Sequence, residues 1–503
     1  MTGNRRLLRT GLMLLVALSG GAARGEDHFL TIGGGYSPTG NQVSLEKNVL
    51  YFQRLLSDLH LANQPHEIFF SDGDDPRRDV EFADPSAATP RVNMLLARVF
   101  DKEDLLDYRF RTHQVPGIRG ASSPDNLDRW FSEVGARLKP GDRLIVYLTG
   151  HGGKGTDVQN PHFFMWNRRQ MDMKDFASRL DKLPESVPVV LVMVQCYSGG
   201  FANAIFKDGD AKAGLSAANR CGFYATVSDR PAAGCTADIH DENYKEYSTS
   251  FWSALCGHSR TGESVAPPDY DGDGRVSFAE AHAYTVLSSD TIDIPVKTSD
   301  AFLRAFSKTK ANNLPALLTV DSPYEALLAV ASPIDRAVLE GLSSQLGLRG
   351  ARRAQAAREL AAKVEKERGG IDRDKKKLSD KYQAARLQIA ETVKFRWPEL
   401  QNPWHPQAID DLRLEGSEIV AAIEAHDSFS TFDQMHNELE QRSSQSLDLE
   451  RRWAKCQRFL RFAENVALAG NLAKVATQEI QTRYRALLSS ESGTLCGPAD
   501  AAR

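Results

Sequence analysis

Two uninterrupted apolar runs constrain most strongly what this chain can fold into. "LIVYLTGHGG" covers residues 144–153 and "VVLVMVQCYSGG" covers 189–200, and neither run alternates apolar with polar residues. A strand that is apolar along its whole length must be covered on both faces, as in a parallel sheet flanked by helices. The two runs therefore predict an α/β fold with a mostly parallel sheet.

Strand and helix signals alternate over residues 26 to about 298, which supports this fold class. The polar stretch 73–122 is predicted to be irregular, with a short helix near "VNMLLARVF". A helix is also expected to start at "FANAIF", directly after the second apolar run. The other expected strands are 28–35, 66–72 and 221–229, and the other expected helices are 44–60, 126–138 and 171–183.

From about residue 299 to 503 the composition shifts to Ala, Glu, Lys and Arg, which predicts an all-α, coiled-coil-like C-terminal domain. Val364, Ile371 and Leu378 recur at heptad spacing, and Gly369-Gly370 is expected to interrupt that helix. After a Pro-rich break at 397–406, a second helical stretch is predicted over about 435–488. An antiparallel helical hairpin or small bundle is the favoured interpretation, and a partner-binding or inhibitory module is the alternative.

Residues 1–25 have the pattern of a cleavable signal peptide, with basic residues, a short apolar stretch and the small-residue site Ala23-Arg24-Gly25. We therefore expect a periplasmic or secreted protein without a stable membrane anchor. The net charge of −4 gives no indication of a nucleic-acid partner. In an oxidising compartment, Cys456 is expected to pair with Cys496. The sequence leaves the pairing among Cys221, Cys235 and Cys256 open, with Cys221–Cys235 preferred.

Each apolar run ends at a reactive residue, His151 in the first and Cys196 in the second. In an open parallel sheet, ligands bind beyond the carboxyl ends of the strands, so neighbouring strands would bring both side chains to one crevice. A nearby imidazole can activate a thiol as a nucleophile. The main-chain N–H groups of Gly152 and Cys196 are the predicted oxyanion donors.

These two blocks, "YLTGHGG" and "VQCYSGG", resemble the His-Gly and Cys blocks of caspase- and legumain-like cysteine peptidases, with legumains the closer match. The resemblance extends over residues 28–240 and includes "TIGGGYSPTGN" and "FYATVSDRPAAGC". It implies a caspase-like three-layer α/β/α sandwich for residues 26–298. It also implies that His151 is the general acid and base, and Cys196 the nucleophile, of acyl-thioester chemistry on peptide bonds.

The substrate pocket departs from the family pattern. The position two residues before the Cys is commonly acidic or Gln, whereas this chain has Val194 followed by Gln195. Gln195, Ser228 and Asp229 are the predicted pocket residues, and Asp229 is a candidate carboxylate for a basic substrate side chain. Asp229 also fits a simple turn before Arg230-Pro231, so the cleavage preference stays open.

The segment "DYDGDGRVSFAE" (269–280) fits the twelve-residue EF-hand loop and predicts a structural Ca²⁺ site. Gly274 occupies the sixth position, where the chain turns sharply. The preceding "GESVAPP" is not helical, so half of the helix–loop–helix is missing. The predicted ligands are Asp269, Asp271, Asp273, the carbonyl of Arg275, Ser277 and Glu280.

The predicted function is that of an exported cysteine-type endopeptidase acting on a peptide or protein substrate. One alternative is a catalytically degenerate caspase-like scaffold whose C-terminal helices bind a protein partner. Another is a different thiol enzyme on the same fold, such as a transpeptidase or an amidase.

Overall fold

The computed structural model describes residues 25–495 except 85, 87, 105 and 309–316. Its centre is a seven-stranded sheet in the order β12-β11-β10-β6-β1-β2-β5. All neighbouring strands are parallel except β12, which runs antiparallel to β11. The strands are β1 (Asp27–Gly33), β2 (His66–Phe70), β5 (Ile118–Gly120), β6 (Arg143–Thr149), β10 (Val189–Met193), β11 (Arg220–Tyr224) and β12 (Val296–Lys297).

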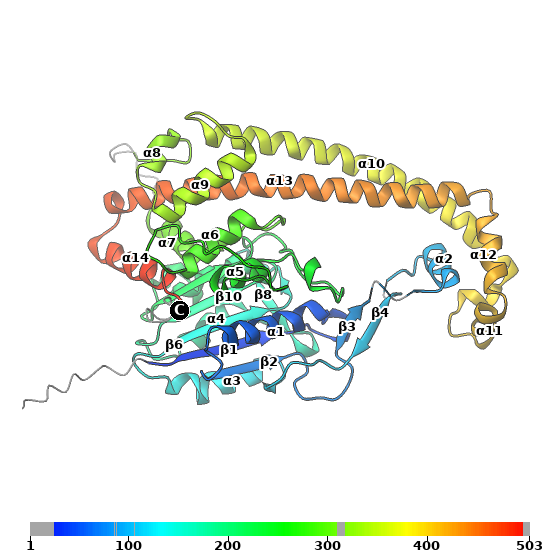
Figure 1. Cartoon of the computed structure of the whole chain (residues 1–503), viewed down its shortest axis with the longest axis horizontal. Helices are drawn as coiled ribbons and strands as arrows, with labels where there is room; N and C mark the ends of the chain where they lie inside the picture. The colour runs from blue at the N-terminus through cyan, green and yellow to red at the C-terminus, as the bar shows by residue number, and fades with distance from the viewer. Residues whose placement is uncertain (1–24, 85, 87, 105, 309–316, 496–503) are drawn as a thin grey trace, which may run out of the picture.

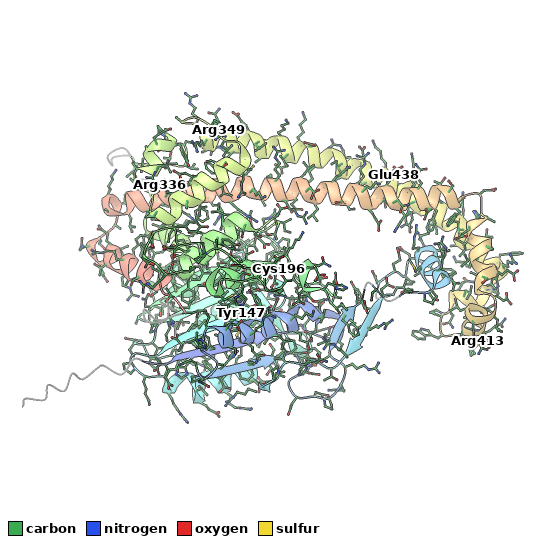
Figure 2. The ribbon with its side chains drawn as sticks, in the orientation of Figure 1. Tyr147, Cys196, Arg336, Arg349, Arg413 and Glu438 are labelled. Carbon is green, nitrogen blue, oxygen red and sulfur yellow. The ribbon has the colours of Figure 1, made fainter. Side chains whose placement is uncertain are left out.

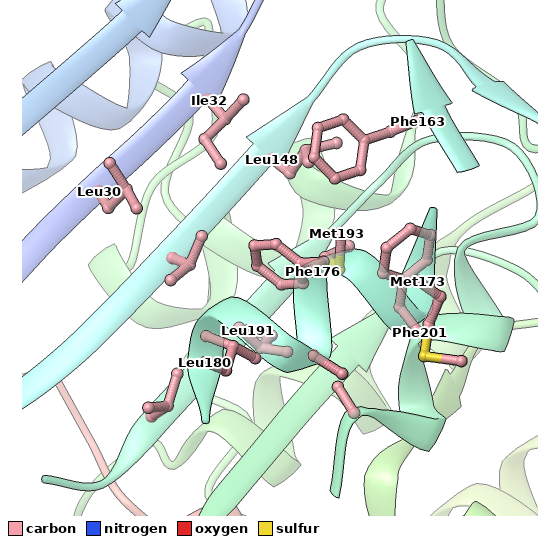
Figure 3. Packing of buried hydrophobic residues seen from close by; sticks show 14 of the residues in the cluster. Leu30, Ile32, Leu148, Phe163, Met173, Phe176, Leu180, Leu191, Met193 and Phe201 are labelled. Atoms are coloured by element: carbon pink, nitrogen blue, oxygen red, sulfur yellow. The ribbon is translucent and has the colours of Figure 1, made fainter. Parts of the chain in front are cut away.

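Helices cover both faces of this sheet, as the apolar strands predicted. Along β6, Leu144, Val146 and Leu148 face one core, whereas Ile145 and Tyr147 face the other, because successive strand residues point to opposite faces. Figure 3 shows the first of these cores. That core includes side chains of α3 (Pro124–Glu133) and α4 (Met173–Leu180), and the second includes α1 (Val43–Asp58), α5 (Tyr247–Cys256), α6 (Phe278–Ser288) and α7 (Thr298–Phe306).

The stretch 73–122 is more ordered than predicted. It contains the expected helix, α2 (Arg91–Phe100), but also the antiparallel pair β3 (Val80–Ala83) and β4 (Tyr108–Arg111), and the sheet-edge strand β5. These strands are three or four residues long, and β4 is partly exposed, so the sequence carries no run of buried residues to reveal them. A second small sheet, also unforeseen, joins β7 (Gly152–Gly153), β8 (His162–Met165) and β9 (Arg169–Asp172).

The C-terminal region is helical, and its two longest helices run side by side across the sheet domain (Figure 1). The predicted interruption at Gly369-Gly370 is wrong, because the helix α10 (Arg353–Arg396) continues through both glycines. Each glycine costs about 1 kcal/mol relative to Ala, which the surrounding strong helix formers offset. The helices are α8 (Tyr324–Leu328), α9 (Pro333–Leu346), α10 (Arg353–Arg396), α11 (Pro406–Leu414), α12 (Gly416–Glu424), α13 (Phe429–Val475) and α14 (Gln478–Glu491).

The helical pair contacts the remainder of the chain at both ends. At one end, α13, α14 and α9 pack on α6, α7 and β11 of the sheet domain. At the other end, α10, α12 and α13 form a separate apolar cluster with α2. The stretch predicted as one helix over 435–488 is thus two helices, α13 and α14, which are separated at Ala476-Thr477.

The described cysteines are all free thiols. The preferred pairing of Cys221 with Cys235 is wrong, because Cys221 is buried in β11 and Cys235 is exposed on a loop beyond that strand. The predicted partner of Cys456, Cys496, lies outside the described residues, as does the predicted signal peptide up to residue 24. Among the described helices, none is both long and apolar enough to cross a membrane.

Candidate active site

His151 and Cys196 lie beyond the carboxyl ends of two neighbouring parallel strands. β6 and β10 pair from Leu144 with Val189 to Leu148 with Met193, so the segments that follow them leave the sheet side by side. A Cβ atom on Gly152 would lie 2.0 Å from the carbonyl oxygen of Cys196. Only glycine allows this close approach of the two backbones, which brings the His and Cys loops into direct contact.

The imidazole of His151 is held by the loop before α1. Its Nε2 lies 2.9 Å from the carbonyl oxygen of Gly40 and 2.8 Å from Oε1 of Gln42. The ring of Tyr36 packs edge-on against it, with the two centroids 5.3 Å apart. Both Nε2 contacts are acceptors, so Nε2 carries the proton and donates to them, which leaves Nδ1 as the basic nitrogen.

Burial lowers the pKa of His151 below its usual range, and the Gly40 carbonyl only partly opposes this shift. The imidazole is therefore neutral at neutral pH, the form that accepts a proton. The Gln42 side chain also donates from Nε2 to Oε1 of Glu81 at 3.3 Å, which fixes the amide in place. Sequence reasoning missed this role of Gln42, because Gln42 and His151 are 109 positions apart.

The thiol of Cys196 is half-buried beneath the loop after β11. The N–H of Ala232 points at Sγ at 3.3 Å, and Sγ lies 3.8 Å from the carbonyl oxygen of the same residue. Burial raises the pKa of Cys196, and the carboxylate of Asp293 adds to this, whereas the N–H groups of Ala232, Cys196 and Gly152 favour the thiolate. The predicted oxyanion donors Gly152 and Cys196 thus both lie beside the sulfur.

Across the residues that the structure describes, no hydrogen bond joins His151 to Cys196. Catalytic hydrogen bonds are often long in substrate-free enzymes and shorten when the substrate binds. The residue after the nucleophile, Tyr197, adopts a left-handed backbone conformation at φ 61°, and its N–H donates to the carbonyl of Arg230. The expected helix after Cys196 is a 3-10 segment, Ser198–Ile205, and not an α-helix.

The three predicted pocket residues have different surroundings. Gln195 is almost fully buried, and neither polar atom of its side-chain amide has a hydrogen-bond partner. Val194, two residues before the Cys, belongs to the core. Ser228 and the exposed Asp229 line a hollow of about 560 Å³, whose lining also includes Lys297 and Arg461 but neither Cys196 nor His151.

Asp293 and Arg458 hold the loop that covers the thiol, and neither was foreseen from the sequence. The N–H of Ala233 donates to Oδ1 of Asp293 at 2.7 Å. Arg458 of α13 is fully buried and donates to the main-chain carbonyls of Val286, Ser289, Thr291 and Asp293, at 2.7–3.0 Å. A helix of the C-terminal region therefore shapes the loop on which the active-site loop rests.

A second contact links α13 directly to the active-site loop. The guanidinium of Arg230 pairs with Glu450 at 2.6 Å and lies over the ring of Trp453 at 4.7 Å. In Figure 2, Cys196 lies between the sheet, marked by Tyr147, and the long helical pair. Because Ala232 follows Arg230 by two positions, this ion pair helps to fix the backbone over the sulfur.

The EF-hand-like loop lies before α6, at the end of that helix farthest from Asp293. One carboxylate oxygen each of Asp269, Asp271 and Asp273 lies within 4.8 Å of the others, and all three side chains are exposed. Gly274 has φ 83°, as the sharp turn at the sixth position requires. Glu280 accepts the N–H of Tyr270 at 2.8 Å and so turns its carboxylate toward the loop.

The residues at the loop's other predicted positions have helix-capping and chain-turning roles. Ser277 caps α6 in a reciprocal capping box with Glu280, and the N–H of Arg275 donates to the Asp273 carboxylate at 2.9 Å. The donor set is all oxygen, which is what Ca²⁺ requires. No helix enters the loop, since residues 257–277 before α6 are not helical apart from turns. The side chains present therefore fit a calcium ion.

Three comparisons with known proteins bear on this site. Residues 135–255 match the model of the Peptidase C13 family. A search of curated proteins gives no match. A solved structure of a protein from Geobacter sulfurreducens is 9% identical, with 46% of this chain and 80% of that chain covered and a TM-score of 0.26. The chain is thus similar to the Peptidase C13 family over the segment that carries His151 and Cys196, which confirms the predicted resemblance and indicates a cysteine peptidase with a peptide or protein substrate.

Proposed function

We propose that the protein is an exported cysteine-type endopeptidase that hydrolyses peptide bonds with Cys196 and His151. One observation carries the proposal: the His and Cys loops touch at Gly152, beyond the carboxyl ends of β6 and β10. This is where a parallel α/β sheet binds its ligands. The same segment lies within the residues that match the peptidase family.

In the proposed reaction, Nδ1 of His151 takes the thiol proton, since Nε2 is committed to Gly40 and Gln42. The sulfur then attacks the peptide carbonyl carbon, and the N–H groups of Gly152 and Cys196 stabilise the oxyanion. His151 returns the proton to the leaving amine, which leaves an acyl-thioester on the sulfur. A water molecule, deprotonated by His151, hydrolyses the thioester and restores the thiol.

Two further parts of the proposal concern export and calcium. The signal-peptide pattern of residues 1–25 supports a periplasmic or secreted location. The acidic loop from Asp269 to Glu280 supports a structural Ca²⁺ ion at the start of α6. That helix leads to the loop of Asp293, so the ion would steady one end of the element whose other end supports the active site.

A second candidate function is a scaffold whose helices bind a protein partner. The observation that favours it is a set of exposed apolar side chains near the far end of the helical pair, where partner surfaces commonly expose such groups. These side chains are Phe395, Trp404, Ile409 and Leu414, with exposed fractions of 92%, 86%, 61% and 73%.

The deciding experiment compares the wild-type chain with Cys196→Ala, each with calcium and with a chelator. Both are incubated with fluorogenic peptides that vary the residue before the scissile bond. Cleavage by the wild type alone is expected and would give the cleavage preference. Aminolysis of the acyl-enzyme in place of hydrolysis would indicate a transpeptidase. No cleavage, together with no labelling of Cys196 by an electrophilic peptide probe, would favour the scaffold.

A further inference from the structure

A small polar cluster lies beyond the carboxyl end of β2 and has no part in the proposed reaction. It consists of Asp72, which follows β2, Asp79, which precedes β3, and His113, which follows β4. One ligand atom of each residue lies within 4.8 Å of the other two. Nδ1 of His113 is 2.9 Å from Oδ2 of Asp79 and 3.8 Å from Oδ1 of Asp72.

Most of this cluster is fixed by hydrogen bonds before any ligand is considered. The other oxygen of Asp79 accepts the main-chain N–H of His113 at 2.8 Å. The side-chain amide of Asn41 donates to the main-chain carbonyl of Asp79 at 2.9 Å and to Oγ of Ser71 at 3.0 Å. Asp79 and His113 are therefore held near one another, and need little rearrangement to receive an ion.

Asp72 is the part that these contacts leave unexplained. Its side chain is 5% exposed, it is directed at the His113 ring, and its Oδ1 is buried with no hydrogen-bond partner. Within the described residues, no Lys or Arg forms an ion pair with Asp72 or Asp79, and the neighbouring Arg111 is paired with Glu46. A buried carboxylate oxygen without a partner is costly, so it points to a group that the protein chain does not supply.

We propose that Asp72, Asp79 and His113 bind a divalent transition-metal ion, of which Zn²⁺ is the best match. Two carboxylate oxygens and one imidazole nitrogen suit Zn²⁺, whereas Ca²⁺ prefers oxygen ligands alone. Three protein ligands leave a position for water, as in many zinc sites. This site differs in donor chemistry and burial from the exposed, all-oxygen loop at Asp269, and it does not depend on the peptidase proposal.

The ion would brace the loop that holds His151. Asn41, which holds the backbone of Asp79, is followed directly by Gln42, which contacts Nε2 of His151. The carbonyl of Asn41 also accepts the N–H of Glu81 at the start of β3. An ion on Asp79 would thus restrain residues 35–42, because Asn41 also accepts the N–H of Gly35.

The test titrates Zn²⁺ into the metal-stripped full chain by calorimetry, with bound metal counted by mass spectrometry after desalting. Asp72→Asn is the main variant, because Oδ1 makes no hydrogen bond that the amide would break, and His113→Gln is the second. His258→Gln is the matched control, since His258 faces the single carboxylate of Asp58 at 3.1 Å. Asp271→Asn is a second control. It removes one carboxylate of the acidic loop at Asp269, so that any Zn²⁺ bound by that loop can be recognised.

One Zn²⁺ per chain is expected for the wild type, His258→Gln and Asp271→Asn. Asp72→Asn and His113→Gln should bind at least about tenfold more weakly, since even outer-shell changes cost 10–100-fold. Hydrogen exchange of residues 35–42 should slow on adding Zn²⁺ to the wild type, and not to Asp72→Asn. The proposal would be overturned if the wild type bound no Zn²⁺, or if Asp72→Asn bound it as tightly as His258→Gln.

Discussion

The two ends of α13 pack against different parts of the molecule. At the near end, Phe459 and Phe462 join a core with α6 and α9, and Arg458 is buried among loop carbonyls. At the far end, Phe432 and Met435 pack on α2 and α10, away from the sheet. Between these two ends, over residues 436–453, no residue of α13 is buried. The near end thus supports the candidate active site. The far end instead packs with α2, α10 and α12, which together form the arm of the molecule.

This difference shows that one long helix can serve two purposes. Helical periodicity reports that a face is buried, but not which neighbour covers it. The near end carries a buried charge that organises a loop, and the far end carries apolar side chains that hold α2. If this comparison is correct, substitutions at the two ends should have different effects on the free energy of unfolding and on the reactivity of Cys196.

The largest effect is expected for Arg458→Ala. Removal of the guanidinium leaves several buried carbonyls of residues 286–293 without donors, at about 1–3 kcal/mol each. We expect a loss of at least about 3 kcal/mol in the free energy of unfolding, together with loss of peptidase activity. Chemical denaturation measures the free energy of unfolding, and cleavage of a fluorogenic peptide measures the peptidase activity. Wild-type stability in this variant would contradict the assigned role of the near end.

Phe432→Ala tests the far end. Phe432 is fully buried, stacks on Tyr382 at 5.0 Å between centroids, and lies under the guanidinium of Arg98. Its truncation should cost about 3 kcal/mol in the stability of the arm. Hydrogen exchange should rise in α2 and α12, while labelling of Cys196 stays at the wild-type rate. A large change in Cys196 labelling would show that the two ends are coupled.

The pH dependence of Cys196 alkylation gives the next smaller effect. Burial raises the pKa of this thiol above its ordinary value, so the reactive thiolate is scarce at neutral pH and increases as the pH rises. Arg458→Lys should loosen the covering loop, bring the pKa down and speed alkylation at neutral pH. Phe432→Ala should keep the wild-type profile. Mass spectrometry of the Cys196 peptide measures both rates separately from the exposed Cys235.

The smallest effect is expected for Glu450→Gln, which weakens the ion pair with Arg230. The pair is mostly buried, so a loss of about 1 kcal/mol is expected, with a moderate rise in Cys196 labelling. Glu424→Gln is the matched change at the far end, where Arg91 and Glu424 are more exposed. It should cost at most about 0.5 kcal/mol and leave labelling unchanged. Equal effects of Glu450→Gln and Glu424→Gln on Cys196 labelling would contradict the claim that only the near end of α13 supports the active site.

The sequence by itself determined the α/β architecture and the place of the two reactive residues. The apolar runs before His151 and Cys196 had to be central strands, because only a sheet covered on both faces buries such segments. Helical periodicity likewise revealed the long C-terminal pair. Local signals were sufficient here because a strand that is buried on both faces is apolar at every position.

Tertiary structure alone decided which residues surround the site. Gln42, Asp293 and Arg458 lie 109, 97 and 262 positions from the reactive residues that they support, and no local pattern links them. Asp229, one of the three pocket residues predicted from the sequence, lines a hollow whose lining does not include Cys196. Short strands and long-range contacts leave no periodic signal, since they depend on how distant segments meet.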